Sequence, residues 1–181
     1  ELNVRDHNGH TAFMSACGNG HKDIVKMLLD HADKIELNAR NNKGWTAFMW
    51  ACKFGHKDVV KVLLDNSERI EFNTKCRIFN MTALMWACNG GHKDVVQLLL
   101  DHSERIELNA RNNRGWTAFI GACRYGKVQV VKFLIKDPNI ELNARTNHGM
   151  TAFICACGEG HKDVVQLLLD HSEIIDLNAR E

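Results

Sequence analysis

Apolar positions along the chain follow the spacing of two short helices in succession. In one stretch, Ala51 and Cys52 follow Phe48 at spacings of three and four, which are typical of one face of an amphipathic helix. A few residues later, Val59 and Leu63 belong to a second apolar stripe of the same kind. The residues between the two stripes include glycine, histidine and lysine. The pattern therefore predicts a pair of short helices that each bury one side.

Residues at the borders of the two stripes support this interpretation. Thr46 is a suitable N-cap for the first helix, and Gly55 is a suitable residue to end it. Asp58 falls in the first turn of the second helix, where a negative charge interacts favourably with the helix dipole. Residues 70–73 then alternate apolar and polar, which predicts a short extended segment. The unit is predicted to be turn, helix, turn, helix and extended finger.

This unit recurs along the whole chain. Its first helix is always preceded by a threonine, and the intervals between these threonines run from 34 to 36 residues: Thr11, Thr46, Thr82, Thr117 and Thr151. A fixed period in this range indicates a repeat array, in which each unit buries its apolar face only against its neighbours. Such an array usually presents an extended surface rather than a closed catalytic pocket.

Two strings within the unit carry a family resemblance. Residues 44–52 are GWTAFMWAC and residues 55–64 are GHKDVVKVLL. They resemble the ankyrin repeat, with its G-x-T-P-L-H-x-A-A and G-H-x-x-x-V-x-x-L-L patterns at a period of about 33 residues. The resemblance implies an all-α solenoid of stacked helix-turn-helix pairs with β-turn fingers along one edge. It divides a single array, 1–181, into repeats at about 5–38, 40–73, 76–109, 111–143 and 145–178, with partial fingers at 1–4 and 179–181.

The chain departs from the family pattern after each second helix. The glycine that ends this helix in the family is missing, and the loop is about two residues longer. We expect the second helix to extend by a partial turn and an isoleucine after it to plug the core: Ile35, Ile70, Ile106, Ile140 and Ile175. The finger before Thr82 also has one extra residue, with Asn80 in place of glycine.

Charge and composition narrow the classes of partner. The chain has 23 basic and 22 acidic residues and is 45% hydrophobic, so nothing in its net charge favours a nucleic-acid or membrane partner. No apolar run approaches the ~20 residues that a membrane-spanning helix needs.

Most cysteines follow an alanine at the same place in each repeat: Cys17, Cys52, Cys88, Cys123 and Cys157. Equivalent positions in stacked helix pairs lie about 10 Å apart, whereas a disulfide needs Cα atoms within about 7 Å. We therefore expect these thiols to be reduced and buried as packing residues. Reduced cysteines favour an intracellular, cytoplasmic location.

Candidate chemistry is sparse. The family's Gly-His position is occupied by four histidines, which we expect to bond neighbouring loop carbonyls: His21, His56, His92 and His161. No Cys or His cluster has the spacing of a four-ligand metal site. The chain has no phosphate-binding loop, nucleophile elbow or paired-carboxylate signature. The sequence therefore predicts no enzyme activity, no metal and no cofactor.

Large aromatic and cationic residues concentrate in the middle three repeats. Aromatic residues and arginine dominate the energetics of protein interfaces. We therefore expect a protein or peptide to bind along the concave groove and finger tips, at Trp45, Trp50, Lys53, Phe54, Met81, Trp86, Arg114, Trp116, Arg124 and Tyr125. The alternative is a packing role for the rings, with Trp50 and Trp86 wedged between neighbouring first helices.

The fingers carry two further ladders. Acidic residues precede basic ones by four positions, as in Glu36 and Arg40, and we expect weak ion pairs within each finger. With Lys43 and Arg114, the fingers could attract an acidic peptide. In some ankyrin proteins a finger asparagine is hydroxylated, and the matching positions are Asn38, Asn73, Asn109, Asn143 and Asn178.

Near-identity between repeats favours a rival function. Residues 161–169 copy 92–100 residue for residue, so we expect the last repeat to be uncapped and the chain to come from a longer array. Bare apolar ends could drive end-to-end self-association. Uniform units also fit a structural spacer without a dedicated ligand, whereas the uneven distribution of aromatic residues fits a binding module.

Overall fold

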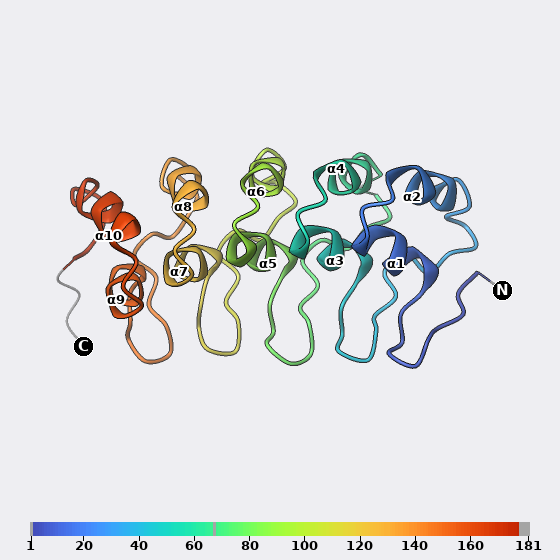
Figure 1. Cartoon of the computed structure of the whole chain (residues 1–181), viewed down its shortest axis with the longest axis horizontal. Helices are drawn as coiled ribbons and strands as arrows, with labels where there is room; N and C mark the ends of the chain where they lie inside the picture. The colour runs from blue at the N-terminus through green and yellow to red at the C-terminus, as the bar shows by residue number, and fades with distance from the viewer. Residues whose placement is uncertain (1, 67, 178–181) are drawn as a thin grey trace.

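Stacked pairs of short antiparallel helices make up the array, as the computed structural model shows for residues 2–66 and 68–177 (Figure 1). The first helices of the pairs are α1 (Ala12–Gly18), α3 (Ala47–Lys53), α5 (Ala83–Gly90), α7 (Ala118–Arg124) and α9 (Ala152–Gly158). The second helices are α2 (Lys22–Leu29), α4 (Lys57–Asp65), α6 (Lys93–Leu100), α8 (Val128–Leu134) and α10 (Lys162–Leu169). The predicted all-α solenoid is confirmed.

The helices form two layers. First helices pack on first helices and second helices on second helices, while the loops between repeats project from the side of the first helices (Figure 1). The described residues contain no strand, and within the segment predicted to be extended, 70–73, the chain bends at residues 72 and 73. The alternation of apolar and polar residues in this segment corresponds to alternating burial, because Ile70 and Phe72 are buried and Glu71 is exposed. No described helix is long and apolar enough to cross a membrane.

Each first helix begins at its threonine. The Thr46 hydroxyl accepts a hydrogen bond from the backbone N–H of Met49 at 3.3 Å, which satisfies one of the donors left free at a helix start. The equivalent bond is present at every first helix, on Thr11, Thr46, Thr82, Thr117 and Thr151. The predicted capping role of Thr46 is confirmed.

Histidines at the starts of second helices connect neighbouring repeats. The Nε2 atom of His92 lies 2.7 Å from the carbonyl oxygen of Lys53, one repeat earlier. His56 and His161 make the same contact with Gly18 and Arg124, both at 2.8 Å, as the sequence predicted. Gly55 has a φ of 74° and faces the His92 ring, so a side chain here would be strained and would collide with the imidazole.

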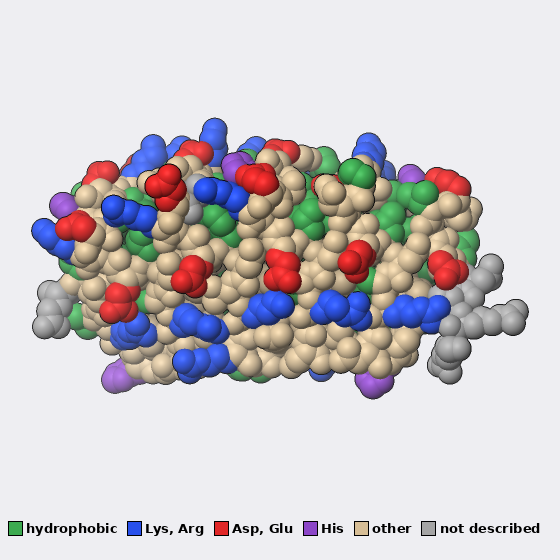
Figure 2. Space-filling view, turned by 180° about the vertical axis from the view of Figure 1, so that it is seen from behind, with side chains coloured by type: hydrophobic (Ala, Val, Ile, Leu, Met, Phe, Trp, Pro, Cys, Tyr) green, Lys and Arg blue, Asp and Glu red, His purple; other side chains and the backbone are tan. Residues whose placement is uncertain are grey.

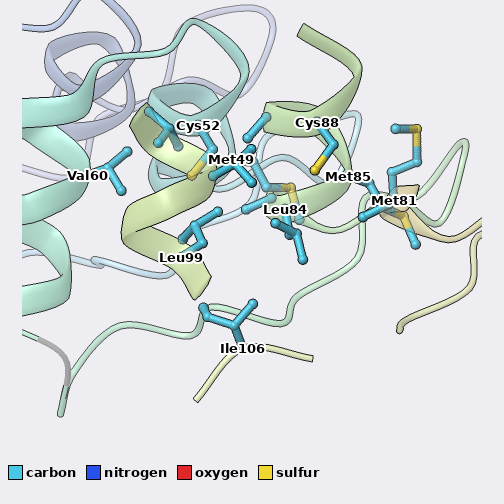
Figure 3. Close-up of a cluster of buried hydrophobic side chains, with 14 of the residues drawn as sticks. Met49, Cys52, Val60, Met81, Leu84, Met85, Cys88, Leu99 and Ile106 are labelled. Atoms are coloured by element: carbon cyan, nitrogen blue, oxygen red, sulfur yellow. The ribbon is translucent and has the colours of Figure 1, made fainter. Parts of the chain in front are cut away.

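The core fills the space between the two helix layers. Met49 and Cys52 of α3, Leu84 of α5 and Leu99 of α6 are among its fully buried side chains (Figure 3). Because neighbouring repeats contribute to the same cluster, the apolar core is continuous along the array.

The cysteine ladder is buried, with one exception. Cys17, Cys52, Cys88 and Cys123 are fully buried, and burial raises the pKa of each thiol above its ordinary value. Cys157 is exposed, so its predicted burial was wrong. It faces the open end of the described array, where no further repeat covers it.

The ends of the second helices differ from the prediction. The α-helix stops at Leu29 in α2, and the chain continues through turns in which N–H groups bond carbonyls three residues back, such as His31 N–H to Leu28. In the described repeats the predicted extension thus takes the form of turns rather than α-helix, except that α4 runs one residue further than α2, α6 and α10, to Asp65. The isoleucine plugs are confirmed, because Ile35, Ile70, Ile106, Ile140 and Ile175 are all buried.

Asparagines join successive repeats at the bases of the fingers. The Asn73 amide donates to the carbonyl of Arg105 at 2.9 Å, and its oxygen accepts from the N–H of Glu107 at 2.8 Å. The same double bridge is made by Asn3, Asn38, Asn109 and Asn143. We call these residues the asparagine ladder. Asn178 lies outside the described residues.

The acidic and basic residues at the finger bases form ion pairs between successive fingers. Arg5 pairs with Glu36, at the base of the next finger, at 2.7 Å, and Lys75 pairs in the same way with Glu107 at 3.9 Å. Figure 2 shows the resulting row of acidic side chains beside a row of basic ones. The ion pairs predicted within single fingers were therefore wrong for these residues. The fingers stack side by side, which brings Arg5 and Lys75 close to an acidic residue of the following finger, whereas Arg40 and Arg111 donate to backbone carbonyls there.

Candidate protein-binding surface

Aromatic rings from two repeats surround one lysine side chain. The Lys53 Nζ atom lies 4.6 Å from the ring centroid of Trp45 and 5.2 Å from that of Trp86. It lies 5.5 Å from the rings of Trp50 and Phe54. These distances fall within the range of cation–π attraction. We call this arrangement of four rings around the ammonium the lysine cage.

Local structure explains how the cage is built. Trp50 and Lys53 are three positions apart on α3, so they share one side of the helix. Trp86 occupies the position on α5 that Trp50 occupies on α3. Trp45 is held in the finger because the Asn41 side-chain oxygen accepts its backbone N–H at 2.9 Å. Its ring centroid lies 4.7 Å from Trp50 and 4.4 Å from Trp86.

Three predicted contact residues are buried. Trp45, Met81 and Trp116 are only 5%, 6% and 9% exposed, so they are not open finger-tip side chains. Each precedes a capping threonine, and the finger folds back so that the side chain packs against the first helices. Their prediction as direct contacts was wrong in this respect. As buried side chains, they belong to the core on which the exposed residues of the surface rest.

Trp50 and Trp86 are half-buried and pack against the core. Their indole N–H groups and the Asn89 side-chain oxygen are buried without a hydrogen-bond partner among the described residues. This matches the alternative in which both rings wedge between neighbouring first helices. The rings remain partly accessible, so they both pack and line the surface.

The exposed members of the predicted set are Phe54, Tyr125 and Arg114. Phe54 and Tyr125 are 48% and 47% exposed, although each ends a first helix and touches a tryptophan. Arg114 lies 5.6 Å from the Trp116 ring centroid. The Arg124 guanidinium lies on the same ring at 4.8 Å and forms an ion pair with Glu159.

Small depressions lie on both sides of the lysine cage. One has a volume of about 140 Å³ and is lined by His10, Met14, Trp50 and Phe54 among others. Another, of about 130 Å³, includes Phe79, Trp86 and Tyr125. The first lies between repeats one and two and the second between repeats three and four.

His10, Phe79 and Asn89 belong to this surface but were not predicted. Phe79 is 44% exposed and its neighbour Ile78 is 52% exposed. Two large apolar residues at a finger tip, where the other fingers are polar, were a sequence signal that could have identified this part of the surface. The tip is shaped by the extra residue, because Asn80 takes a φ of 56°.

Basic side chains are in excess around the aromatic residues. Lys43, Arg77 and Arg114 are exposed on the fingers, and Lys53 and Arg124 end first helices. Within the described part of the chain, no group of three or more His, Cys, Asp or Glu side chains could hold a metal ion. The surface can therefore offer cations, aromatic faces and shallow apolar depressions to another molecule.

Comparison with known proteins agrees with the fold. A family model described as ankyrin repeats matches three times, at residues 1–76, 67–146 and 104–181. No curated protein matches the chain significantly. The three matches of the family model together span the sequence, and the helix pairs are stacked as such repeats require. The chain belongs to the ankyrin-repeat family.

Proposed function

We propose that this chain is a non-enzymatic interaction module that binds a protein or peptide through its first helices and fingers. Ankyrin repeats generally serve protein interaction. The observation that carries the proposal is the exposure of Phe54 and Tyr125, close to half of each side chain, beside tryptophans and cations. Exposed rings in this setting are typical of binding surfaces rather than of solvated helix ends.

The main alternative is a structural spacer with no dedicated ligand. It is supported by the near-identity of 92–100 and 161–169 on the second helices. The first helices are less uniform, because Trp50 and Trp86 are matched by Ser15, Gly121 and Cys155 in the other repeats. The variation is concentrated on the layer that we propose for binding.

The test compares two double variants. Phe54→Ala with Tyr125→Ala removes exposed rings, and Lys61→Ala with Gln129→Ala removes exposed side chains from interior second helices. Trp45 and Trp116 are left intact because they are buried and their loss would reduce stability. Binders are selected from a random-peptide display library on the parent chain. A binding module loses them in the first variant only, whereas equal retention in both variants favours the spacer.

We also propose that copies of this chain associate end to end. Ile24 of α2 is 49% exposed, whereas the equivalent Val59 and Val95 of interior repeats are 1% exposed. At the other end, Leu169 of α10 is 41% exposed, whereas Leu64 is 2% exposed. Surfaces that are covered by a neighbouring repeat inside the array are thus open at its two ends, and they are complementary.

A reducing, intracellular compartment is our proposal for the location of the protein. It is supported by the cysteines, which are all unpaired. Thiol labelling in cell extracts prepared under acid quench would test it, since the proposal requires all seven cysteines in the reduced form.

A further inference from the structure

The Lys53 ammonium has no carboxylate partner. Among the described residues, acidic groups pair with Arg5, His10, Lys75 and Arg124, and the contacts of the Lys53 ammonium are with the four rings of the lysine cage. Aromatic faces attract a cation but do not replace the strong hydrogen bonds that an ammonium makes with anionic oxygen. The Lys53 side chain is half-buried, so one side of the group remains accessible.

The cage also fixes the position of this cation. A free lysine side chain loses rotamer freedom when it binds a partner, and this loss weakens binding. Lys53 is already held between Trp50 and Phe54 on one helix and Trp86 on the next. An incoming carboxylate would therefore meet a pre-positioned charge.

The exposed charges at the tips of the three middle fingers are basic. Lys43, Arg77 and Arg114 are exposed on the fingers of repeats two, three and four. The acidic groups of the first helices and finger loops near them are engaged within the chain, Asp6 with His10 and Glu159 with Arg124. This face therefore favours a partner of negative charge, and it disfavours a partner that would place its own cation in the cage.

We propose that the face recognises an acidic, extended peptide segment, with a carboxylate on Lys53 and an apolar side chain on each side. This proposal rests on the proposed function and specifies its partner. The two apolar side chains would enter the depressions at His10 and Trp50 and at Phe79 and Tyr125. These depressions are two repeats apart, which is about 20 Å at one helix diameter per repeat. An extended chain covers that span in about six residues.

Single-stranded nucleic acid is a less suitable anionic partner. Its binding usually depends on open ring faces on which bases stack. Here the ring of Trp45 is buried, and those of Trp50, Trp86 and Trp116 are covered in part by the cations of Lys53, Arg114 and Arg124. The net charge of +1 also gives little general attraction for a polyanion.

The experiment uses fluorescein-labelled peptides and fluorescence anisotropy. The acidic probe carries two leucines six positions apart, with Asp and Glu between them. The neutral probe has Asn and Gln in the same places. Lys53→Gln is compared with Lys61→Gln, which removes an exposed lysine from the second-helix layer, and with Lys53→Arg, which keeps the charge. Circular dichroism melting confirms that all variants are folded.

We expect the acidic probe to bind about tenfold or more tightly than the neutral probe, because a charge-assisted hydrogen bond is lost in the latter. Lys53→Gln should weaken the acidic probe by a similar factor, while Lys61→Gln and Lys53→Arg should not. Equal binding of the two probes, or an unchanged affinity in Lys53→Gln, would overturn the proposal. Tighter binding of a dT20 oligonucleotide that is lost in Lys53→Gln would also overturn it, in favour of nucleic acid.

The library selection separates this inference from the proposed function. If selected peptides are not acidic but are lost with Phe54→Ala and Tyr125→Ala, the binding module stands and the acidic specificity is wrong. If no selected peptide depends on those residues, both are wrong. Enrichment of Asp and Glu between apolar residues about six positions apart supports both.

Discussion

At the scale of single residues, Cys157 differs from its equivalents only in what covers it. Its side chain is exposed at the end of α9, whereas Cys17, Cys52, Cys88 and Cys123 are fully buried. The thiolate is the reactive form of cysteine, and burial both blocks reagents and raises the pKa of the ladder thiols. One repeated residue therefore has two different reactivities.

This difference predicts the labelling of the native protein by a disulfide reagent such as DTNB. Cys157 should react fast and the other six cysteines slowly, because those six are buried. The fast phase should disappear in Cys157→Ser, and Cys17→Ser should retain it. A fast phase that survives in Cys157→Ser would contradict the described burial of the other six cysteines.

Trp45 and Phe54 offer a second comparison between a buried ring and an exposed one. Trp45→Ala should reduce the free energy of unfolding by about 3–5 kcal/mol, because it leaves a cavity between Trp50 and Trp86. Phe54→Ala should cost about 1 kcal/mol, since the ring is 48% exposed. Urea denaturation followed by circular dichroism measures both. Similar costs for the two variants would mean that Trp45 is not the buried ring.

The contrast between buried and exposed rings also shows how much of the site could be predicted from the sequence. The location of large residues in the middle repeats was visible in the sequence, and Phe54 and Tyr125 are exposed as a contact surface requires. The burial of Trp45 and Trp116 was not visible, because a large ring is suitable both for a core and for an interface. Only the direction in which the finger folds distinguishes the two roles.

At the scale of elements, the finger bases are fastened by hydrogen bonds more than by charge. Each member of the asparagine ladder both donates to and accepts from the backbone of the next repeat, as Asn73 does with Arg105 and Glu107. The exposed ion pairs beside the ladder, such as Arg5 with Glu36, are of a kind that contributes roughly 0–1 kcal/mol each.

We therefore expect Asn73→Ala to lower the free energy of unfolding by about 1–2 kcal/mol, since two inter-repeat hydrogen bonds are lost. Asn139→Ala is the control, because only the backbone of Asn139 takes part in the ladder. The control should cost less than about 0.5 kcal/mol. A chemical denaturation series at two salt concentrations measures both variants. If Asn139→Ala costs as much as Asn73→Ala, the ladder does not fasten the repeats.

The helices were predictable because their signals are local. Thr46 caps the helix that directly follows it, and the apolar stripes repeat within nine residues or fewer. The ion pairs were not predictable in the same way, because Arg5 and Glu36 are 31 positions apart and meet only when fingers stack. Sequence spacing of four residues suggested a partner within the finger, and the stacked arrangement provides a closer one.

At the scale of the whole molecule, the two ends of the described array present faces that interior repeats cover. Met27 of α2 is 66% exposed, whereas Val62 at the same position of α4 is 7% exposed. A contact between unlike ends does not close on itself, so it would generate chains of increasing length.

Sedimentation velocity should reveal this association as a sedimentation coefficient that rises with protein concentration. Met27→Glu should suppress the rise, because it places a charge in the contact between ends. Gln129→Glu adds the same charge on an exposed interior position of α8 and should leave the rise unchanged. A coefficient independent of concentration in the parent chain would rule out the proposed contact.

The restriction of contacts to adjacent repeats also determines how the chain responds to tension. Force along its length acts on each boundary in series, and each boundary is held by its own share of core packing, histidine contacts and asparagine bridges. The weakest boundary yields first and releases one repeat of about 35 residues, which extends to roughly 120 Å. Successive steps of this size would let the chain behave as a rod at low load and lengthen gradually at high load. A partner bound across two repeats would be released when the boundary between those repeats yields.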